Sequence, residues 1–211
     1  MAKGKVKLVR VNNERHMVVT QVARLSFPKL FTASSFQDNP NERPEFSCDL
    51  IFDSMDDLKK PWAGKKTKTV SFLRAIKNVK VDQWGEDESK WPKFPFPLIR
   101  KGDDRKDAEG KVLDGYEGKF FVKVKSGEDY PPEIVLANGQ PATKEDVYGG
   151  CFVQAQILCR PYTSPNPGVA GRIVRIKFVK DGEAFGAGAD MMEYDENEET
   201  DDEDSEENDD F

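Results

Sequence analysis

The stretch Gly118-Lys-Phe-Phe-Val-Lys-Val-Lys-Ser126 decides the predicted fold, because its apolar and charged residues alternate. Successive side chains of a β-strand point to opposite faces, so this alternation predicts a half-buried strand. The core-facing residues would be Phe120, Val122 and Val124. The residues of the opposite face would be Lys119, Phe121, Lys123 and Lys125.

Further strands are predicted by the same alternation or by an excess of β-branched residues. They are residues 17–25, 46–52, 133–136, 151–162 and 172–180. The core-facing residues expected in three of them are Phe46, Cys48, Leu50 and Phe52; Cys151, Val153, Ala155, Ile157 and Cys159; and Val174, Ile176 and Phe178. Residues 32–45 are rich in Ser, Asn and Pro and predict a loop.

Between residues 65 and 83 the apolar residues change to the period of a helix. Phe72, Ala75, Ile76 and Val79 share one side, and basic residues lie roughly opposite, which predicts an amphipathic helix. Strands outnumber this one long helix. The predicted fold class is therefore all-β, a small barrel with the helix inserted between its strands.

A polar, turn-rich insertion separates the helix from the central strand. Its segment Trp91-Pro-Lys-Phe-Pro-Phe-Pro97 contains three prolines, which exclude a helix there. Trp91, Phe94 and Phe96 are therefore expected on an extended segment.

The C-terminal end of the chain differs sharply in charge from the rest. Residues 190–211 hold 14 of the 39 acidic residues and none of the 32 basic ones, so residues 1–189 carry 25 acids against 32 bases, a net charge of +7. A run of this kind cannot bury enough apolar surface to order itself, which predicts one domain over 1–189 and a disordered acidic tail over 190–211. As a tethered polyanion, the tail is expected to compete with nucleic acid for the basic body.

The tail ends in an aromatic residue, Phe211, which a merely solubilising tail does not need. A peptide that docks in a pocket of another protein does need such an anchor. Phe211 with Asp209 and Asp210 is therefore predicted to bind a partner protein.

Composition argues against several classes of protein. No run of about 18 apolar residues could span a membrane, and residues 1–10 lack the apolar stretch of a signal peptide. The chain has three cysteines without CxxC spacing, and His16 is its only histidine. These counts argue for a reducing cytosol and against a disulfide scaffold or a structural zinc site. No metal or cofactor is expected.

Basic and aromatic residues interleaved on outward strand faces are the main functional signal. Binding single-stranded DNA (ssDNA) without sequence preference needs positive charge for the phosphates and flat side chains for the bases. The residues expected to meet these needs are Lys119, Phe121, Lys123, Lys125, Arg160, Tyr162, Arg175 and Lys177. Secondary candidates are Trp62, Trp91, Tyr116, Phe152 and Arg172.

Two other functions stay open at this point. Asp114 with Glu117-Gly118-Lys119 has the carboxylates and the lysine of a Mg²⁺-dependent nuclease, although so short a pattern often arises by chance in a highly charged chain. An acidic-tailed interaction protein that shields basic partners would use the tail alone. Such a protein would not need a basic body with outward aromatic residues.

Three segments and the tail together resemble phage-encoded single-stranded DNA-binding proteins. The segments are Ala23-Arg-Leu-Ser-Phe-Pro-Lys-Leu-Phe31, Asp114-Gly-Tyr-Glu-Gly-Lys-Phe-Phe-Val-Lys-Val-Lys-Ser126 and Tyr148-Gly-Gly-Cys151. The resemblance covers most of the chain and implies an OB-fold barrel with an inserted helix, a groove for ssDNA and frequent homodimers. The insertion from Trp91 to Pro97 matches no family motif.

The same resemblance implies a role for the protein and its tail. The tail would recruit replication proteins such as a polymerase, helicase or primase. The protein would serve DNA replication, recombination and repair in the cytoplasm of an infected bacterial host, and it would not be an enzyme.

Overall fold

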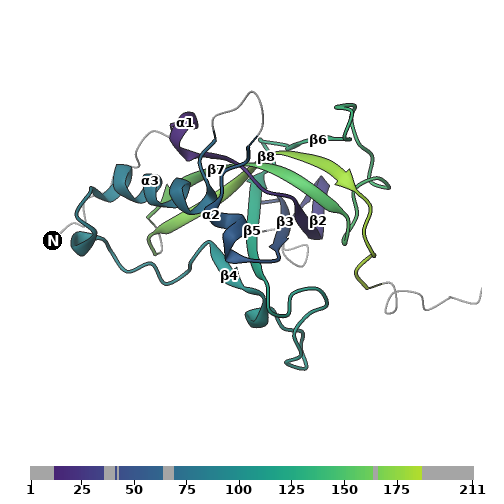
Figure 1. The fold of residues 1–211 in the computed structure, drawn as a ribbon, viewed down its shortest axis with the longest axis horizontal. Coiled ribbons are helices and arrows are strands. Elements are labelled where there is room, and N and C mark those ends of the chain that lie inside the picture. Colours follow the sequence, from purple (N-terminus) through teal and green to yellow (C-terminus); the bar gives the residue numbers. More distant parts are fainter. Residues whose placement is uncertain (1–11, 36–40, 42, 64–68, 164–165, 187–211) are drawn as a thin grey trace, which may run out of the picture.

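The computed structural model describes residues 12–35, 41, 43–63, 69–163 and 166–186, and Figure 1 shows their fold. The predicted tail, with Asp209, Asp210 and Phe211, lies outside the described residues. The helices are α1 (Asn13–His16), α2 (Met55–Lys59) and α3 (Phe72–Trp84), with 3₁₀ turns at Glu88–Lys90 and Gly102–Asp104. The strands are β1 (Met17–Val19), β2 (Ala23–Ser34), β3 (Glu45–Phe52), β4 (Ile99–Lys101), β5 (Phe120–Gly127), β6 (Glu133–Val135), β7 (Phe152–Tyr162) and β8 (Gly168–Lys180).

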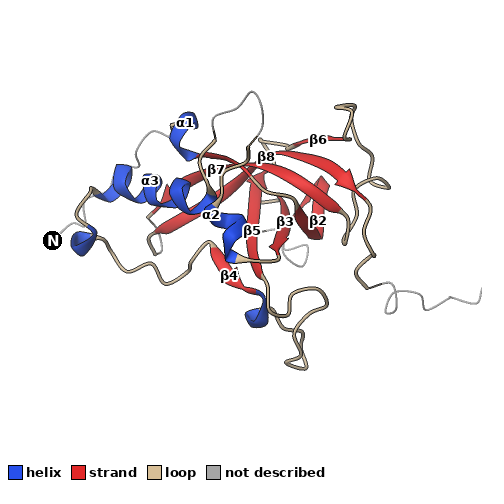
Figure 2. Cartoon of the chain, viewed as in Figure 1, coloured by secondary structure: helices blue, strands red, loops and turns tan. Residues whose placement is uncertain are grey.

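Five strands pair in a closed ring, which confirms the predicted all-β class (Figure 2). The order of pairing is β2–β3–β5–β8–β7 and back to β2. The link between β5 and β8 is parallel and opposes Lys125 to Arg172, whereas the other four are antiparallel. The predicted small barrel takes the form of this ring, with β1, β4 and β6 attached outside its path.

The inside of the ring is the hydrophobic core, and the alternation of the sequence predicted most of it. The expected faces of β3 and β7 are buried, as are Val122 and Val124 of β5, while Phe120 packs against the core from a partly exposed position. The three cysteines are free and buried in this core. Burial raises the pKa of the Cys151 thiol to about 11, so this cysteine packs as a small uncharged side chain.

Strand β8 departs from the predicted alternation at Val174. Gln156 opposes Arg175 while the next residue, Ile157, opposes Ile173, so Val174 is an extra residue in β8. This bulge reverses the alternation, because one inserted residue moves every following side chain to the other face. The core therefore receives Ile173 as well as Ile176, and the prediction that Val174 points inward was wrong.

The predicted amphipathic helix is confirmed as α3, which begins at Phe72 rather than 65; residues 64–68 lie outside the described part. The Ser71 side chain caps its start by accepting a hydrogen bond from the Arg74 amide. Gly85 ends it with φ at +90°, a conformation that favours glycine. The buried residues Phe72, Ala75 and Val79 pack against the ring, where α3 contacts β7 (Figure 1). None of the helices in the described ranges is both long and apolar enough for a membrane span.

The predicted strand over residues 17–25 is divided in two. β1 ends at Val19 and β2 begins at Ala23. Thr20 between them keeps the pairing with β7, because its amide donates to the Ala155 carbonyl and its hydroxyl accepts from the Ala155 amide. Strand β2 also runs further than predicted, to Ser34, and so takes the first residues of the expected loop.

The segment 102–119, named here the covering loop, lies over part of the outer face of β3 and β5. It buries Ile51, Tyr116 and Phe121 in a second apolar cluster, with Phe121 only 3% exposed. The Tyr116 and Phe121 rings meet edge to face, with centroids 5.3 Å apart. The prediction that Phe121 is an open stacking surface was therefore wrong, because the loop that precedes β5 folds back over its outer face. The same cluster buries the secondary candidate Tyr116.

A buried carboxylate fastens the covering loop. Asp49 on the outer face of β3 is 1% exposed, and it accepts a hydrogen bond of 2.9 Å from the Tyr116 hydroxyl. Arg105 of the loop pairs with the same carboxylate oxygen at 3.3 Å. Burial raises the pKa of the Tyr116 phenol, and the neighbouring Asp49 charge raises it further, so the hydroxyl keeps the proton that it donates.

The burial of Phe121 predicts a loss of stability on truncation. Phe121→Ala should lower the free energy of unfolding by about 3–5 kcal/mol, because it removes a buried ring and leaves a cavity. Chemical denaturation measures this change. The control is Phe96→Ala, whose ring is 55% exposed and whose loss should change stability by no more than about 0.5 kcal/mol. Equal losses in the two variants would contradict the burial of Phe121.

The bond between Tyr116 and Asp49 predicts a second effect on stability. Tyr116→Phe keeps the ring and removes only the donor, so it should cost about 1–3 kcal/mol by leaving a buried charge with one hydrogen bond fewer. Tyr130→Phe is the matched control, since the Tyr130 ring is 57% exposed. The two free energies of unfolding are compared by the same denaturation experiment. A Tyr116→Phe protein as stable as the parent would show that this bond does not fasten the loop.

Candidate nucleic-acid interface

The outer face of the ring carries a groove where the covering loop ends. It consists of two adjoining cavities of about 260 and 150 Å³, and Lys123 and Lys125 of β5 line both. We name the two cavities together the basic groove. Its charged residues are Lys29, Arg43, Arg100, Arg105, Lys123 and Lys125, with Glu45 and Asp49.

The charge of the basic groove is positive. Six basic residues line it against two acidic ones, and both acidic residues are paired within it: Glu45 with Lys125, and Asp49 with Arg105. A concave surface lined by one sign of charge concentrates its field and attracts ions of the opposite charge. The groove is therefore suited to a polyanion.

Lys123 lies at the centre of this surface and is partly desolvated. Burial lowers the pKa of its ammonium group, and the positive charges of Lys125, Arg105 and Arg100 lower it further, against the raising effect of Asp49. An ammonium group that has lost part of its hydration gains from a nearby anion. A phosphate beside Lys123 would supply that anion.

The structure gathers only some of the predicted site residues in the basic groove. Lys123, Lys125 and Tyr162 line it. Lys119 lies at the end of the covering loop, where it pairs with Asp53 at 2.9 Å. Arg160 is exposed on β7, two residues before Tyr162, and so lies near the same end of the groove.

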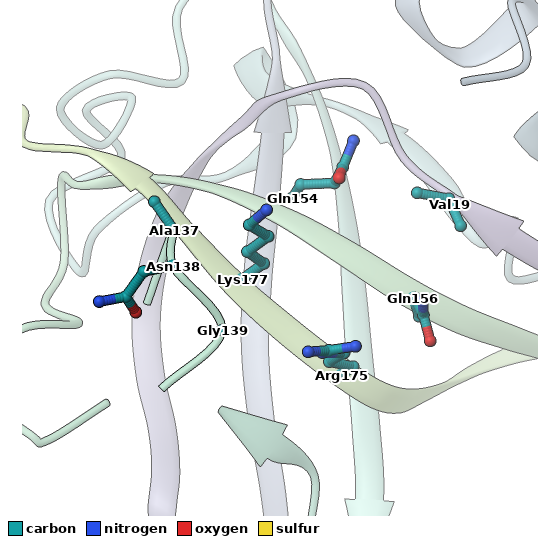
Figure 3. Close-up of a pocket in the computed structure, with 8 residues that line it drawn as sticks. All are labelled: Val19, Ala137, Asn138, Gly139, Gln154, Gln156, Arg175 and Lys177. Atoms are coloured by element: carbon teal, nitrogen blue, oxygen red, sulfur yellow. The ribbon is translucent and has the colours of Figure 1, made fainter. Parts of the chain in front are cut away.

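Arg175 and Lys177 belong to a different cavity, which Figure 3 shows. They extend from β8 beside Gln154 and Gln156 of β7, opposite the turn at Asn138. Arg175 pairs with Glu133 at 3.2 Å. The sequence predicts one site for these two residues and the β5 lysines, but the curvature of the ring divides them between two cavities.

The secondary candidates are spread over the molecule. The Arg172 guanidinium lies 5.1 Å from the Tyr130 ring, and the Phe152 ring lies below the Lys180 ammonium at 4.6 Å. Trp62 is partly buried, and its carbonyl accepts a hydrogen bond from Thr69.

The aromatic residues of the insertion divide into two groups. The Trp91 indole donates to the Gly85 carbonyl, and Phe94 packs edge to face on Trp84, so both rings cover the end of α3. The Lys80 ammonium lies 4.0 Å from the Phe94 centroid. Phe96 instead lines the basic groove. The insertion therefore has a structural part and a part at the site.

Sequence reasoning missed four basic residues of the groove: Lys29, Arg43, Arg100 and Arg105. They come from β2, β4 and irregular segments, where no alternation marks an outward side chain. Arg100 precedes Lys101 on the short strand β4, which pairs with β5. The clustering of basic residues at 100–106 was the only available signal, and it does not say which of them reach the groove.

The residues of the nuclease hypothesis do not converge in the described structure. Asp114 and Glu117 are exposed on the covering loop, and Lys119 pairs with Asp53. Within the described ranges, no group of three or more His, Cys, Asp or Glu side chains is arranged to hold a metal ion.

Comparison with known proteins gives a family and a fold. Residues 16–207 match the profile of a family described as the ssDNA-binding protein of Enterobacter phage Enc34. Protein p50 of Acyrthosiphon pisum secondary endosymbiont phage 1 is 29% identical over 182 residues, which make up 82% of this chain and 89% of p50.

Solved structures share the arrangement of strands. The single-stranded DNA-binding protein of bacteriophage Enc34, in complex with ssDNA, matches with a TM-score of 0.60 and 18% identity over 87% of this chain and 99% of that one. The single-stranded DNA-binding protein gp2.5 of bacteriophage T7 matches with a TM-score of 0.50 and 11% identity over 82% and 96%. At such low identities these matches show a common fold.

Proposed function

The chain belongs to the family of the ssDNA-binding protein of Enterobacter phage Enc34, and from this premise we propose that it binds ssDNA without sequence preference in the basic groove. The role is a binding role in phage DNA replication and recombination, in the cytoplasm of the bacterial host. The family member solved in complex with ssDNA supports this proposal through its shared fold.

The observation that carries the proposal is the position of Lys123 and Lys125. These lysines line both cavities of the basic groove, so a strand lying along the groove passes them wherever it enters. Basic side chains that contact phosphates bind every sequence alike, because phosphates carry no sequence information.

We further propose that the acidic tail competes with DNA for this groove. Phe185, near the end of the described chain, is anchored to the body: its amide donates to the Gly149 carbonyl, and the Arg24 guanidinium lies 4.1 Å from its ring. Phe185 also packs against the cluster of Tyr116 and Phe121 below the covering loop. Phe185 therefore lies next to the loop whose Arg105 lines the groove. A tail tethered through a short segment after Phe185 would have a local concentration of about a millimolar.

The end of the tail has a separate proposed role. Phe211, with Asp209 and Asp210, would dock into a replication protein, since an aromatic anchor beside acidic residues suits a pocket with a basic rim. A polymerase, helicase or primase is the class of partner proposed. The homodimer that the family resemblance implies stays a prediction.

A prediction on DNA binding compares the lysine pair of the basic groove with the basic pair of the other cavity. Replacing Lys123 and Lys125 together by Gln should weaken ssDNA binding at least tenfold and reduce the log–log salt slope by about 1.4, because each lost phosphate contact removes about 0.7. The matched control replaces Arg175 and Lys177 by Gln, which removes the same charge from the other cavity and should change both quantities less. Binding of oligothymidine is measured across a salt series.

Two outcomes would contradict the prediction that the DNA lies in the basic groove. If the control pair weakens binding more than the groove pair, the DNA follows the β7–β8 face instead. If neither pair changes the affinity or the slope, phosphate contacts do not hold the strand and the proposal fails.

A further prediction separates the two proposed roles of the tail. Deleting residues 193–211 should tighten ssDNA binding at low salt and change little at about 1 M salt, where the Debye length is about 3 Å. Deleting Phe211 alone should leave ssDNA affinity unchanged and weaken binding to the replication partner. Equal affinities of the intact and truncated proteins at low salt would refute the competition.

A further inference from the structure

The two exposed phenylalanines of the basic groove are not needed for the core. Phe27 is 50% exposed in the first cavity, and Phe96 is 55% exposed in the second. Of these two cavities, Phe27 lines only the first and Phe96 only the second. Lys123 and Lys125 line both cavities and so lie between the two rings. The groove therefore has an aromatic ring toward each end and positive charge in the middle.

The backbone of Phe27 is strained. Its φ is +47°, and it is the only residue other than glycine with a positive φ in the described part of the chain. A bulky residue in this region is uncommon and persists only where the surroundings enforce it. Here the pairing of β2 with β3 shifts register between Ser26 and Lys29, so Phe27 is in a bulge that redirects its side chain.

Residues on both sides hold this bulge in place. Ser26 pairs with Asp49 and Lys29 with Ser47, while Leu30 is buried in the core. Glycine would fit this conformation without strain. The exposed Phe27 ring contributes little to the core. A phenylalanine at this strained backbone position therefore indicates a role in binding rather than in packing.

The Phe27 ring already has a flat partner. The Arg105 guanidinium lies 4.9 Å from its centroid while also pairing with the buried Asp49. Arg105 thus supports one face of the ring. A nucleobase, which is also planar, would stack on the opposite face.

Phe96 is presented in a different way. Pro95 and Pro97 flank it, and each fixes its own φ near −65°. The segment therefore loses little conformational freedom when a ligand binds, which favours affinity. This explains the proline-rich insertion, whose other aromatic residues cover the end of α3.

We propose that Phe27 and Phe96 are the base-stacking residues of the basic groove, one toward each end, with Lys123 and Lys125 contacting the phosphates between them. This inference rests on the proposed function and names its contacts with the bases. Phe27 and Phe96 take the stacking role that the sequence predicted for Phe121, which is buried with Tyr116 below the covering loop.

The test uses two ligands of equal length, an oligothymidine of about 16 nucleotides and an abasic oligonucleotide with the same phosphates. Phe27→Gly and Phe96→Ala should each weaken oligothymidine binding by about 5- to 150-fold, which corresponds to roughly 1–3 kcal/mol for one stacked base. Neither variant should change binding of the abasic strand. Phe31→Ala is the control, because Phe31 is on the same strand as Phe27 and 37% exposed but does not line the groove.

Glycine at position 27 removes the ring and relieves the strain, so Phe27→Gly should unfold at no lower denaturant concentration than the parent. Equal losses on both ligands would overturn the proposal, since an abasic strand has nothing to stack. Unchanged oligothymidine binding would also overturn it. If the lysine pair still matters in that case, the proposed function stands without these contacts; if the lysine pair is also without effect, the proposed function fails with them.

Discussion

A carboxylate buried on the outer side of β3 holds the candidate site together. Asp49 would be costly to bury alone, and it is stabilised by the Tyr116 hydroxyl and by Arg105. Both partners belong to the covering loop, so lifting the loop would leave a buried charge without them. The loop is therefore held where it covers Phe121, and Arg105 is held where it lines the groove.

The covering loop divides one strand face into two environments. Phe121 and Lys123 are neighbours on the outward face of β5, yet Phe121 is buried and Lys123 lines the groove. Along β5, the outward face therefore changes from a buried cluster to a binding surface within two residues. Lys123 at this boundary is partly desolvated, which lowers the pKa of its ammonium group. The fold thus places a cation where a phosphate can replace lost hydration.

The net charge of the whole chain does not show that its body is basic. The net charge of −7 is the sum of a body of +7 and an acidic end of −14. Near the end of the described chain, Arg24 lies on the Phe185 ring, and Phe185 packs on the cluster below the covering loop. Gly115 favours this packing, because its φ is +78° and a Cβ there would lie 2.4 Å from the Phe185 ring, which would have to move.

The sequence by itself determined most of the strands, the inserted helix and most of the core, because these depend on periods of two and 3.6 residues that are visible locally. It also determined the separation of charge between body and tail. It did not show β4, a strand of three residues within the turn-rich insertion. It could not place Phe121, since alternation shows which residues share a face but not what covers that face.

Only the tertiary structure decided which basic residues form one site. The extra residue at Val174 changed the inward side of β8, and the curvature of the ring separated Arg175 and Lys177 from the β5 lysines. Phe27 likewise became a site residue through the bulge in β2. The two bulges depend on the register between paired strands, which the residues of one strand do not record. The separation of the basic residues depends on the closure of the ring, which pairs β5 with the distant strand β8.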